Sequence, residues 1–334
     1  MTRKRDGRSP LRRHELGAMS TSGFHLTCFR FTLAPREEIR LPRMNKGITL
    51  RGAFGSSFRS LVCVHGMASC DECQMHPTCP YGFIFSPRVP EGAERLRLNR
   101  DIPRPFVIKP PLEERQVFEP GDHLCFDLVI VGKAVQFFPY FLVSFRNLGE
   151  RGIGVGRGRF DISKVEALDA NGDLEAVMAK GDPMVRVPEK TIGLADAPPP
   201  PTERVRVDFL TPILLKKEDQ WARPSFGVLM RRLRDRIQAL SYFYCGEALA
   251  MDFRSFGERA DKVRTPYEDL HWIEENRYSK HRDLKHTLKG WVGTVTYEGD
   301  MEDFWPFLWM GQYVHVGKAA VFGQGWYRVV PEGE

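Results

Sequence analysis

The sequence predicts an α+β protein of two tandem domains, each with the element order strand, helix, strand, strand, helix, strand. Three observations support this prediction. The 334 residues exceed what one ordinary hydrophobic core holds. Four consecutive prolines at 198–201 divide the chain. On both sides of them the same order of elements follows, with a glycine-rich stretch before the last strand. This βαββαβ order is typical of ferredoxin-like domains, in which the helices cover one face of an antiparallel sheet.

The first half supplies the six elements of one domain, which we expect at 23–196 after a basic, disordered tail at 1–22. Alternating apolar residues in HLTCFRFTL indicate the first strand, and apolar residues from Leu50 to Leu61 recur at helical spacing. We expect the second helix to end at Gly149. The predicted strands are 25–33, 106–109, 124–131 and 159–165, and the predicted helices are 49–62 and 134–148.

The second half repeats that order, and we expect its domain at 204–331 after a proline-rich linker at 197–203. Ser225 is a good N-cap for its first helix and Gly246 a good stop. Gly311 is expected to end the second helix, as Gly149 does in the first domain. The predicted strands are 205–210, a strand near 270–273, 290–297 and 326–330, and the predicted helices are 225–246 and 302–310.

The net charge of +6 lies mostly in the N-terminal tail, since residues 1–19 hold six Lys or Arg against Asp6 and Glu15. The rest of the chain carries about +2, so nucleic-acid binding has to be argued from local clusters. No apolar run approaches the roughly 20 residues that cross a bilayer. The N-terminus also lacks the apolar core of a secretory signal. We therefore expect a soluble, cytoplasmic protein with no membrane partner.

Two glycine-rich stretches, RGIGVGRGRFDI at 151–162 and GKAAVFGQGW at 317–326, precede the last strand of each half. Neither contains G-x-G-x-x-G, so a dinucleotide fold is not indicated. Each could be only a tight turn from helix to strand. The alternative is an anion site, because bare backbone amides can cradle a phosphate and neighbouring cations add charge. The candidate residues for an extended phosphodiester are Arg151, Gly154, Gly156, Arg157, Gly158, Arg159, Gly317, Lys318, Gly323 and Gly325.

A basic run lies between the predicted strands of the second domain. Five cations outweigh Asp283 there and alternate with Tyr278, His281 and His286, so charge and stacking groups coincide. A solvated surface is the alternative interpretation. The cations are Arg277, Lys280, Arg282, Lys285 and Lys289, of which Lys280 and Arg282 are candidate RNA contacts.

These segments resemble a known family. GKAAVFGQGWYRV, with RYSKHRDLKHTLKGWVGTVTYEGD before it, is similar to the C-terminal domain of the CRISPR-associated repeat-processing endoribonucleases of the RAMP superfamily. ITLRGAFGSSFRSLVC and LGERGIGVGRGRF resemble the matching N-terminal pieces. The resemblance implies an antiviral-defence nuclease that cuts CRISPR precursor transcripts within each repeat to mature guide RNAs. It further implies cleavage without a metal cofactor, giving a 2′,3′-cyclic phosphate or its opened form and a 5′-hydroxyl.

Two other functions stay open. One is a non-catalytic subunit of the same superfamily that binds guide RNA among other CRISPR effector-complex subunits. The other is a zinc-stabilised nucleic-acid module unrelated to CRISPR.

RNA cleavage by internal attack needs a base, an acid and a cation beside the phosphate. The resemblance implies one common place for a catalytic histidine, just after the first helix, where His65 stands. Tyr278, His281, Lys285 and His286 form the competing set, which supplies every required chemical type within nine residues. Catalysis without histidine is the third possibility.

Cys63, Cys70, Cys73 and Cys79 gather in a predicted insertion at 63–85 of the first domain. Their spacing can close around one ion, and thiolates at this density in a cytoplasmic protein favour a metal over disulfides. We expect structural zinc, with an iron–sulfur cluster as the alternative, since metal binding would help so short a segment to fold. Cys28, Cys125 and Cys245 are expected to be small core residues.

Overall fold

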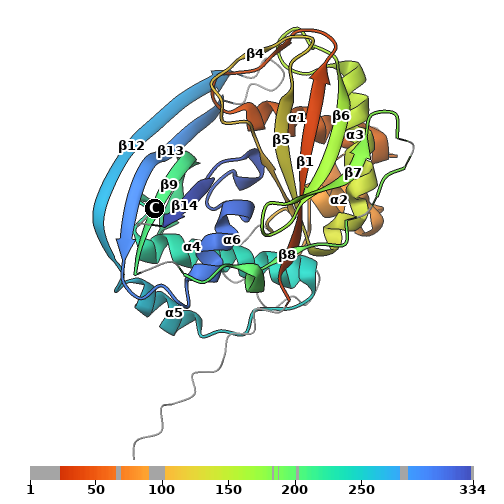
Figure 1. Cartoon of the computed structure of the whole chain (residues 1–334). Helices are drawn as coiled ribbons and strands as arrows, with labels where there is room; N and C mark the ends of the chain where they lie inside the picture. Colours follow the sequence, from red (N-terminus) through yellow and green to blue (C-terminus); the bar gives the residue numbers. More distant parts are fainter. Residues whose placement is uncertain are drawn as a thin grey trace, which may run out of the picture.

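The computed structural model describes residues 23–64, 69–89, 102–182, 184–186, 188–200, 203–278 and 285–331. The first domain is a twisted antiparallel sheet with its two long helices, α1 and α3, on one face (Figure 1). Its strands lie in the order β3-β5-β1-β6-β7, with β8 also paired to β1. The elements are β1 (His25–Pro35), β2 (Ile39–Arg40), α1 (Lys46–Val62), α2 (Pro80–Phe85), β3 (Phe106–Lys109), β4 (Val117–Phe118), β5 (Leu124–Val131), α3 (Phe138–Arg151), β6 (Phe160–Leu168), β7 (Leu174–Ala179) and β8 (Ile192–Gly193).

The second domain repeats this topology. Its four-stranded antiparallel sheet has the order β12-β13-β9-β14, the same order as β3-β5-β1-β6 in the first domain. A short hairpin, β10 (Leu215–Lys217) and β11 (Gln220–Ala222), leads from β9 towards α4. The other elements are β9 (Arg204–Ile213), α4 (Phe226–Leu240), α5 (Phe253–Ala260), β12 (Arg264–Tyr278), β13 (Lys285–Glu298), α6 (Trp305–Val314) and β14 (Tyr327–Pro331).

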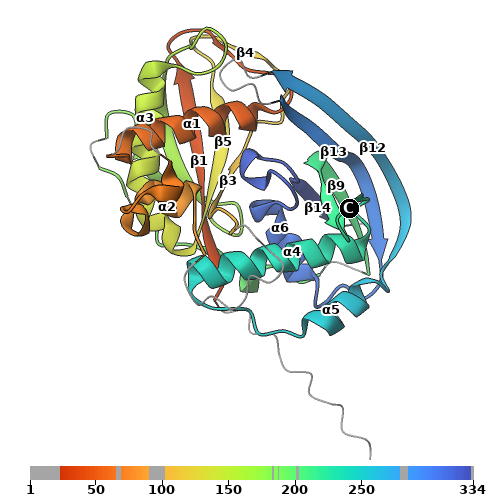
Figure 2. The same cartoon turned by 180° about the vertical axis from the view of Figure 1, so that it is seen from behind.

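The strand β1 is buried on both faces, and this joins the two domains. Phe29 and Phe31 lie in a core with the aromatic residues of α1 and α3, where Phe54 stacks on Phe145 at 4.7 Å between ring centroids. Leu26 and Cys28, on the opposite face, belong to a second core that contains the buried residues of α4 and α6. The molecule is therefore layered as sheet, helices, sheet and helices, with α4 and α6 between the two sheets (Figures 1 and 2).

The predicted tandem ferredoxin-like architecture is confirmed, and the strands 106–109 and 124–131 have the predicted bounds. The helix ends are different. Gly149 lies inside α3 and Gly311 inside α6, so neither ends its helix. The sequence analysis also missed α5 and the length of the hairpin β12–β13, which curves along the outer edge of the second domain (Figure 1).

The segment between α1 and β3 holds two 3₁₀ turns and α2, and its status as an insertion stays a prediction. The same holds for the domain bounds, and the tail 1–22 lies outside the described residues. None of the helices described is long and apolar enough to cross a membrane.

Gly149 allows α3 to lie directly against β6. A Cβ atom at this position would stand 2.3 Å from the carbonyl oxygen of Phe160, whereas a Cβ at Gly52, on the exposed side of α1, would meet nothing within 4 Å. We expect Gly149→Ala to destabilise the protein by about 1–3 kcal/mol through this overlap. Gly52→Ala should stabilise it by about 1 kcal/mol through helix propensity alone. Thermal unfolding of the two variants measures the difference, and shifts of the same sign would contradict this packing.

Candidate nucleic-acid interface

The glycine stretch of the second domain connects α6 to β14 and lies between the two domains. Gly323 has a φ of 85°, and a Cβ there would stand 2.4 Å from Cδ of Pro110, just beyond β3 of the first domain. The side-chain amide of Gln324 donates to Oδ1 of Asn45 at 2.8 Å. The guanidinium carbon of Arg51 lies 4.6 Å from the centroid of the Phe322 ring. The loop therefore forms part of the domain interface.

The backbone amides of this loop already have partners within the protein. Gly323 donates to the Ala320 carbonyl at 2.9 Å, Gly325 to that of Pro212 at 3.0 Å, and Trp326 to Oγ1 of Thr211 at 2.9 Å. Gly323 and Gly325 are also buried. The interpretation of Gly323 and Gly325 as an anion cradle is wrong, because their N–H groups already donate to protein oxygens and are not available to a phosphate. The neighbouring Lys318 is exposed.

The glycine stretch of the first domain is a small closed loop. Ile153 and Gly158 exchange backbone hydrogen bonds at 3.0 and 3.1 Å, and the Val155 amide donates to the Arg40 carbonyl at 2.9 Å. Gly158 is buried against the backbone of Glu38, while Gly156 at the tip is exposed. The amide of Gly158 is therefore also taken, while residues 155–157 at the tip of the loop are exposed.

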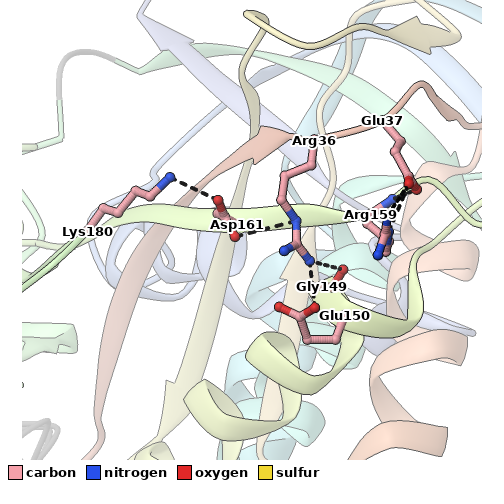
Figure 3. A network of polar contacts seen from close by, with 7 residues as sticks. All are labelled: Arg36, Glu37, Gly149, Glu150, Arg159, Asp161 and Lys180. Atoms are coloured by element: carbon pink, nitrogen blue, oxygen red, sulfur yellow. Dashed lines mark hydrogen bonds and ion pairs between the residues drawn. The ribbon is translucent and has the colours of Figure 1, made fainter.

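Arg159, a predicted phosphate contact, is held by Glu37 instead. Its guanidinium donates twice to Oε1 of Glu37, at 2.8 and 2.5 Å, and these bonds lower the pKa of that carboxyl (Figure 3). Arg36 beside it pairs with Glu150 at 2.8 Å and with Asp161 at 3.6 Å. The network ties the strands β1 and β6 to the end of α3, so its cations are largely neutralised.

Two other arginines of this loop are exposed. Arg151 donates to Oγ of Ser60 at 3.0 Å, which carries no charge. Arg157, with a φ of 57°, has no side-chain hydrogen bond or ion pair with the described residues. Within this loop, these two are the candidates for contact with a ligand.

The basic run forms the end of the hairpin β12–β13. The strand register sets Tyr278 opposite Lys285 and Arg277 opposite His286. Lys280, His281 and Arg282 lie outside the described residues, as does His65 after α1. This end of the hairpin lies towards the end of the molecule that carries β4 (Figures 1 and 2).

Trp221 and Lys216, on the short hairpin β10–β11, are surface residues that the sequence analysis missed. The indole lies beside three lysines, and one of them is Lys318 of the glycine loop. The stretch KKEDQW at 216–221, two lysines and a tryptophan around a turn, was the available signal.

Two family models match the chain. One describes the N-terminal domain of the family AF_1859_N and covers residues 24–190. The other describes the CRISPR-associated endoribonuclease Cas6 and covers residues 207–327. The second domain matches the Cas6 family. This match supports an RNA-cleaving enzyme that processes CRISPR repeat RNA, as the resemblance had implied.

Solved Cas6 structures share the fold at low sequence identity. A product complex of Cas6 from Thermus thermophilus is 14% identical over 91% of this chain and 100% of that chain, with a TM-score of 0.56. A chain of a partial Cas6-RT-Cas1–Cas2 complex is 14% identical over 94% of this chain and 47% of its own length, with a TM-score of 0.55. Identities this low establish the fold alone. No curated protein matches the chain.

The cysteine cluster of the first domain lines one small cavity. Cys63, Cys70, Cys73 and Cys79 surround it together with His76, whose Nε2 donates to the Ser86 carbonyl at 2.7 Å. Burial raises the pKa of the Cys70 thiol. Within the described ranges, no group of three or more His, Cys, Asp or Glu is arranged to hold a metal ion. The predicted structural zinc or iron–sulfur cluster is therefore not supported.

The other cysteines differ among themselves. Cys28 is buried, and burial raises its pKa to about 12, as expected of a core thiol. Cys245 is half-buried, but Cys125 is exposed, so the expectation that it is a core residue is wrong.

His315 packs against the glycine loop of the second domain. Because it is buried, the pH dependence of unfolding tests how this loop is packed. Its ring stacks on Trp326 at 5.6 Å, and burial, together with Lys109 and Arg236, lowers its pKa well below the ordinary value. The unfolded chain takes up a proton as pH falls through about 6.5, while the folded protein does not. At pH values below about 6.5, the free energy of unfolding should therefore decrease by up to about 1.4 kcal/mol per pH unit. Above that pH, the protein keeps its full free energy of unfolding.

His315→Asn suits the φ of 56° and removes the titration. Chemical unfolding at pH about 7.5 and about 5.5 should show a smaller acid loss for this variant than for wild type. His271→Asn, at an exposed position, is the control. Equal acid losses in wild type and His315→Asn would contradict the neutral, buried state of His315.

Proposed function

We propose that the chain cuts CRISPR repeat RNA without a metal ion, by attack of the 2′-hydroxyl next to the scissile phosphate. The products are then a 2′,3′-cyclic phosphate and a 5′-hydroxyl. The match of residues 207–327 to the Cas6 endoribonuclease model carries this proposal, because it covers nearly the whole second domain. The basic hairpin end with its histidines lies within the matched residues and supplies the chemistry.

Four residues of that hairpin end are assigned to catalysis: Tyr278, His281, Lys285 and His286. Tyr278 and Lys285 are directly opposite each other in the register of β12 and β13. Lysine is assigned to stabilise the extra charge of the transition state. His281 and His286 are the candidates for base and acid, since an imidazole exchanges protons near neutral pH. His65 is the competing base.

The RNA backbone is proposed to contact cations of both domains. Lys280, Arg282 and Lys318 lie on the second domain, and Arg151 and Arg157 on the first. The glycine stretch of the first domain forms a β-bridge with Arg40 of β2, and β2 in turn pairs with β4. The hairpin end lies towards the same end of the molecule (Figures 1 and 2), so one RNA can reach both groups. Subunits of a CRISPR effector complex are the second class of partner that we propose.

The test is incubation of the protein with repeat RNA in EDTA. We expect one cut per repeat, and a 2′-deoxy nucleotide at the attacking position should abolish it because the nucleophile is then absent. Alanine at the catalytic histidine should lower the single-turnover rate by about 10²- to 10⁴-fold, the usual contribution of general acid–base catalysis. The variants are His65→Ala, His281→Ala and His286→Ala, with His271→Ala as the exposed control.

Three results would contradict the proposal in different parts. Full activity of all three histidine variants would remove histidine catalysis. Cleavage that stops in EDTA and returns with a divalent cation would remove the metal-free route. Binding of repeat RNA without any cut would indicate the non-catalytic RNA-binding function instead.

A further inference from the structure

An exposed tryptophan sits among three lysines on the second domain. Trp221 belongs to β11 and has 41% of its surface exposed. The ammonium nitrogens of Lys216, Lys289 and Lys318 lie 5.4, 5.8 and 5.7 Å from its ring centroid. These distances are within the range of cation–π attraction, so one indole gathers three positive charges.

The three lysines come from separate parts of the chain that the fold holds together. Lys216 pairs with Trp221 across the hairpin β10–β11, and its carbonyl accepts a bond from Nε of Arg232 on α4 at 2.8 Å. Lys289 belongs to β13 and ends the basic run. Lys318 belongs to the glycine loop, where its amide donates to the Leu214 carbonyl at 3.1 Å. The cluster therefore lies where the basic run and the glycine loop meet.

The charges of this cluster are poorly compensated. Asp219, at the hairpin turn, lies 3.3 Å from Nζ of Lys216 and is itself 97% exposed. Within the described residues, the three lysines form no other ion pair. Contact with an indole at an exposed site is worth only about 0.5–1 kcal/mol per cation, and like charges repel one another. An anion among the lysines would relieve that repulsion.

We propose that Trp221, Lys216, Lys289 and Lys318 bind one unpaired nucleotide of the RNA. The base stacks on the exposed face of the indole, and the lysines contact the phosphates on either side of it. Stacking requires a base that is free of its helix, so the site selects single-stranded over paired RNA. The inference rests on the proposed function for the RNA, and it adds the part of the RNA that is bound here.

Fluorescence anisotropy with labelled oligouridine, and with a blunt RNA hairpin as the paired probe, tests the inference. Trp221→Ala should weaken oligouridine binding by about 5- to 150-fold, the loss of one stacked base, and should affect the blunt hairpin far less. Trp221→Phe should stay close to wild type because it keeps an aromatic face. Trp272→Ala is the matched control, since Trp272 is 39% exposed and its indole N–H lies near the carboxylate of Glu274.

Alanine at the three lysines should make the dependence of log affinity on log salt less steep by about 1.4, at roughly 0.7 for each of the two phosphates contacted on a single strand. Polyglutamate should compete poorly with oligouridine, because it offers no base to stack.

Trp221→Ala binding oligouridine within twofold of wild type would overturn the inference. Equal losses for the single strand and the blunt hairpin, or equal competition by polyglutamate, would also overturn it and indicate a general anion surface. Thermal unfolding at the wild-type midpoint excludes misfolding as the cause of a loss, and Trp221→Phe repeats the test if Trp221→Ala unfolds. These readouts need no cleavage, so failure of the catalytic proposal leaves them interpretable.

Discussion

The contact between the glycine loop of the second domain and the first domain is the constraint on which the rest of the structure depends. Gly323 lies against Pro110, and Gln324 is hydrogen-bonded to Asn45, so two positions far apart in sequence are held together. Beneath this contact the buried residues of α4 and α6 share one core with Leu26 and Cys28 of β1. The domains therefore have a fixed relation to each other.

The same glycine loop also helps to gather cations of the second domain around one indole. Lys318 is positioned beside Trp221 by the same loop that fills the domain boundary, and Lys289 reaches the indole from the hairpin β12–β13. Many of the remaining arginines are engaged within the protein, as Arg159 is with Glu37 and Arg231 is with Asp261. RNA affinity should thus depend on a few uncompensated groups rather than on the total charge, which is small outside the tail.

The sequence predicted the topology because the apolar pattern of each half is strong, and strands such as 106–109 and 124–131 matched the structure to the residue. It misjudged Gly149 and Gly311. Glycine after a helical pattern resembles a stop, but here a bare Cα lets the helix approach the Phe160 carbonyl and the Tyr327 hydroxyl. Only the tertiary contacts reveal that second use of glycine.

Part of the candidate surface was visible in the sequence. The basic run and Lys318 were visible as local charge, and the family resemblance was correct. The predicted amide cradle was wrong, because the loop amides bind within the protein. Gly325 donates to Pro212 and Trp326 to Thr211, and these bonds link residues more than a hundred positions apart, which the sequence does not reveal. The Trp221 cluster was missed for the same reason, since its lysines meet only in the folded chain.

Hydrogen exchange at the amides of residues 323–326 tests most directly whether this loop joins the domains or holds the RNA. We expect slow exchange in the RNA-free protein and no change when repeat RNA is added, because these N–H groups donate to protein oxygens in both states. Fast exchange in the free protein that slows only with RNA would contradict this expectation, since the amides would then be binding phosphate.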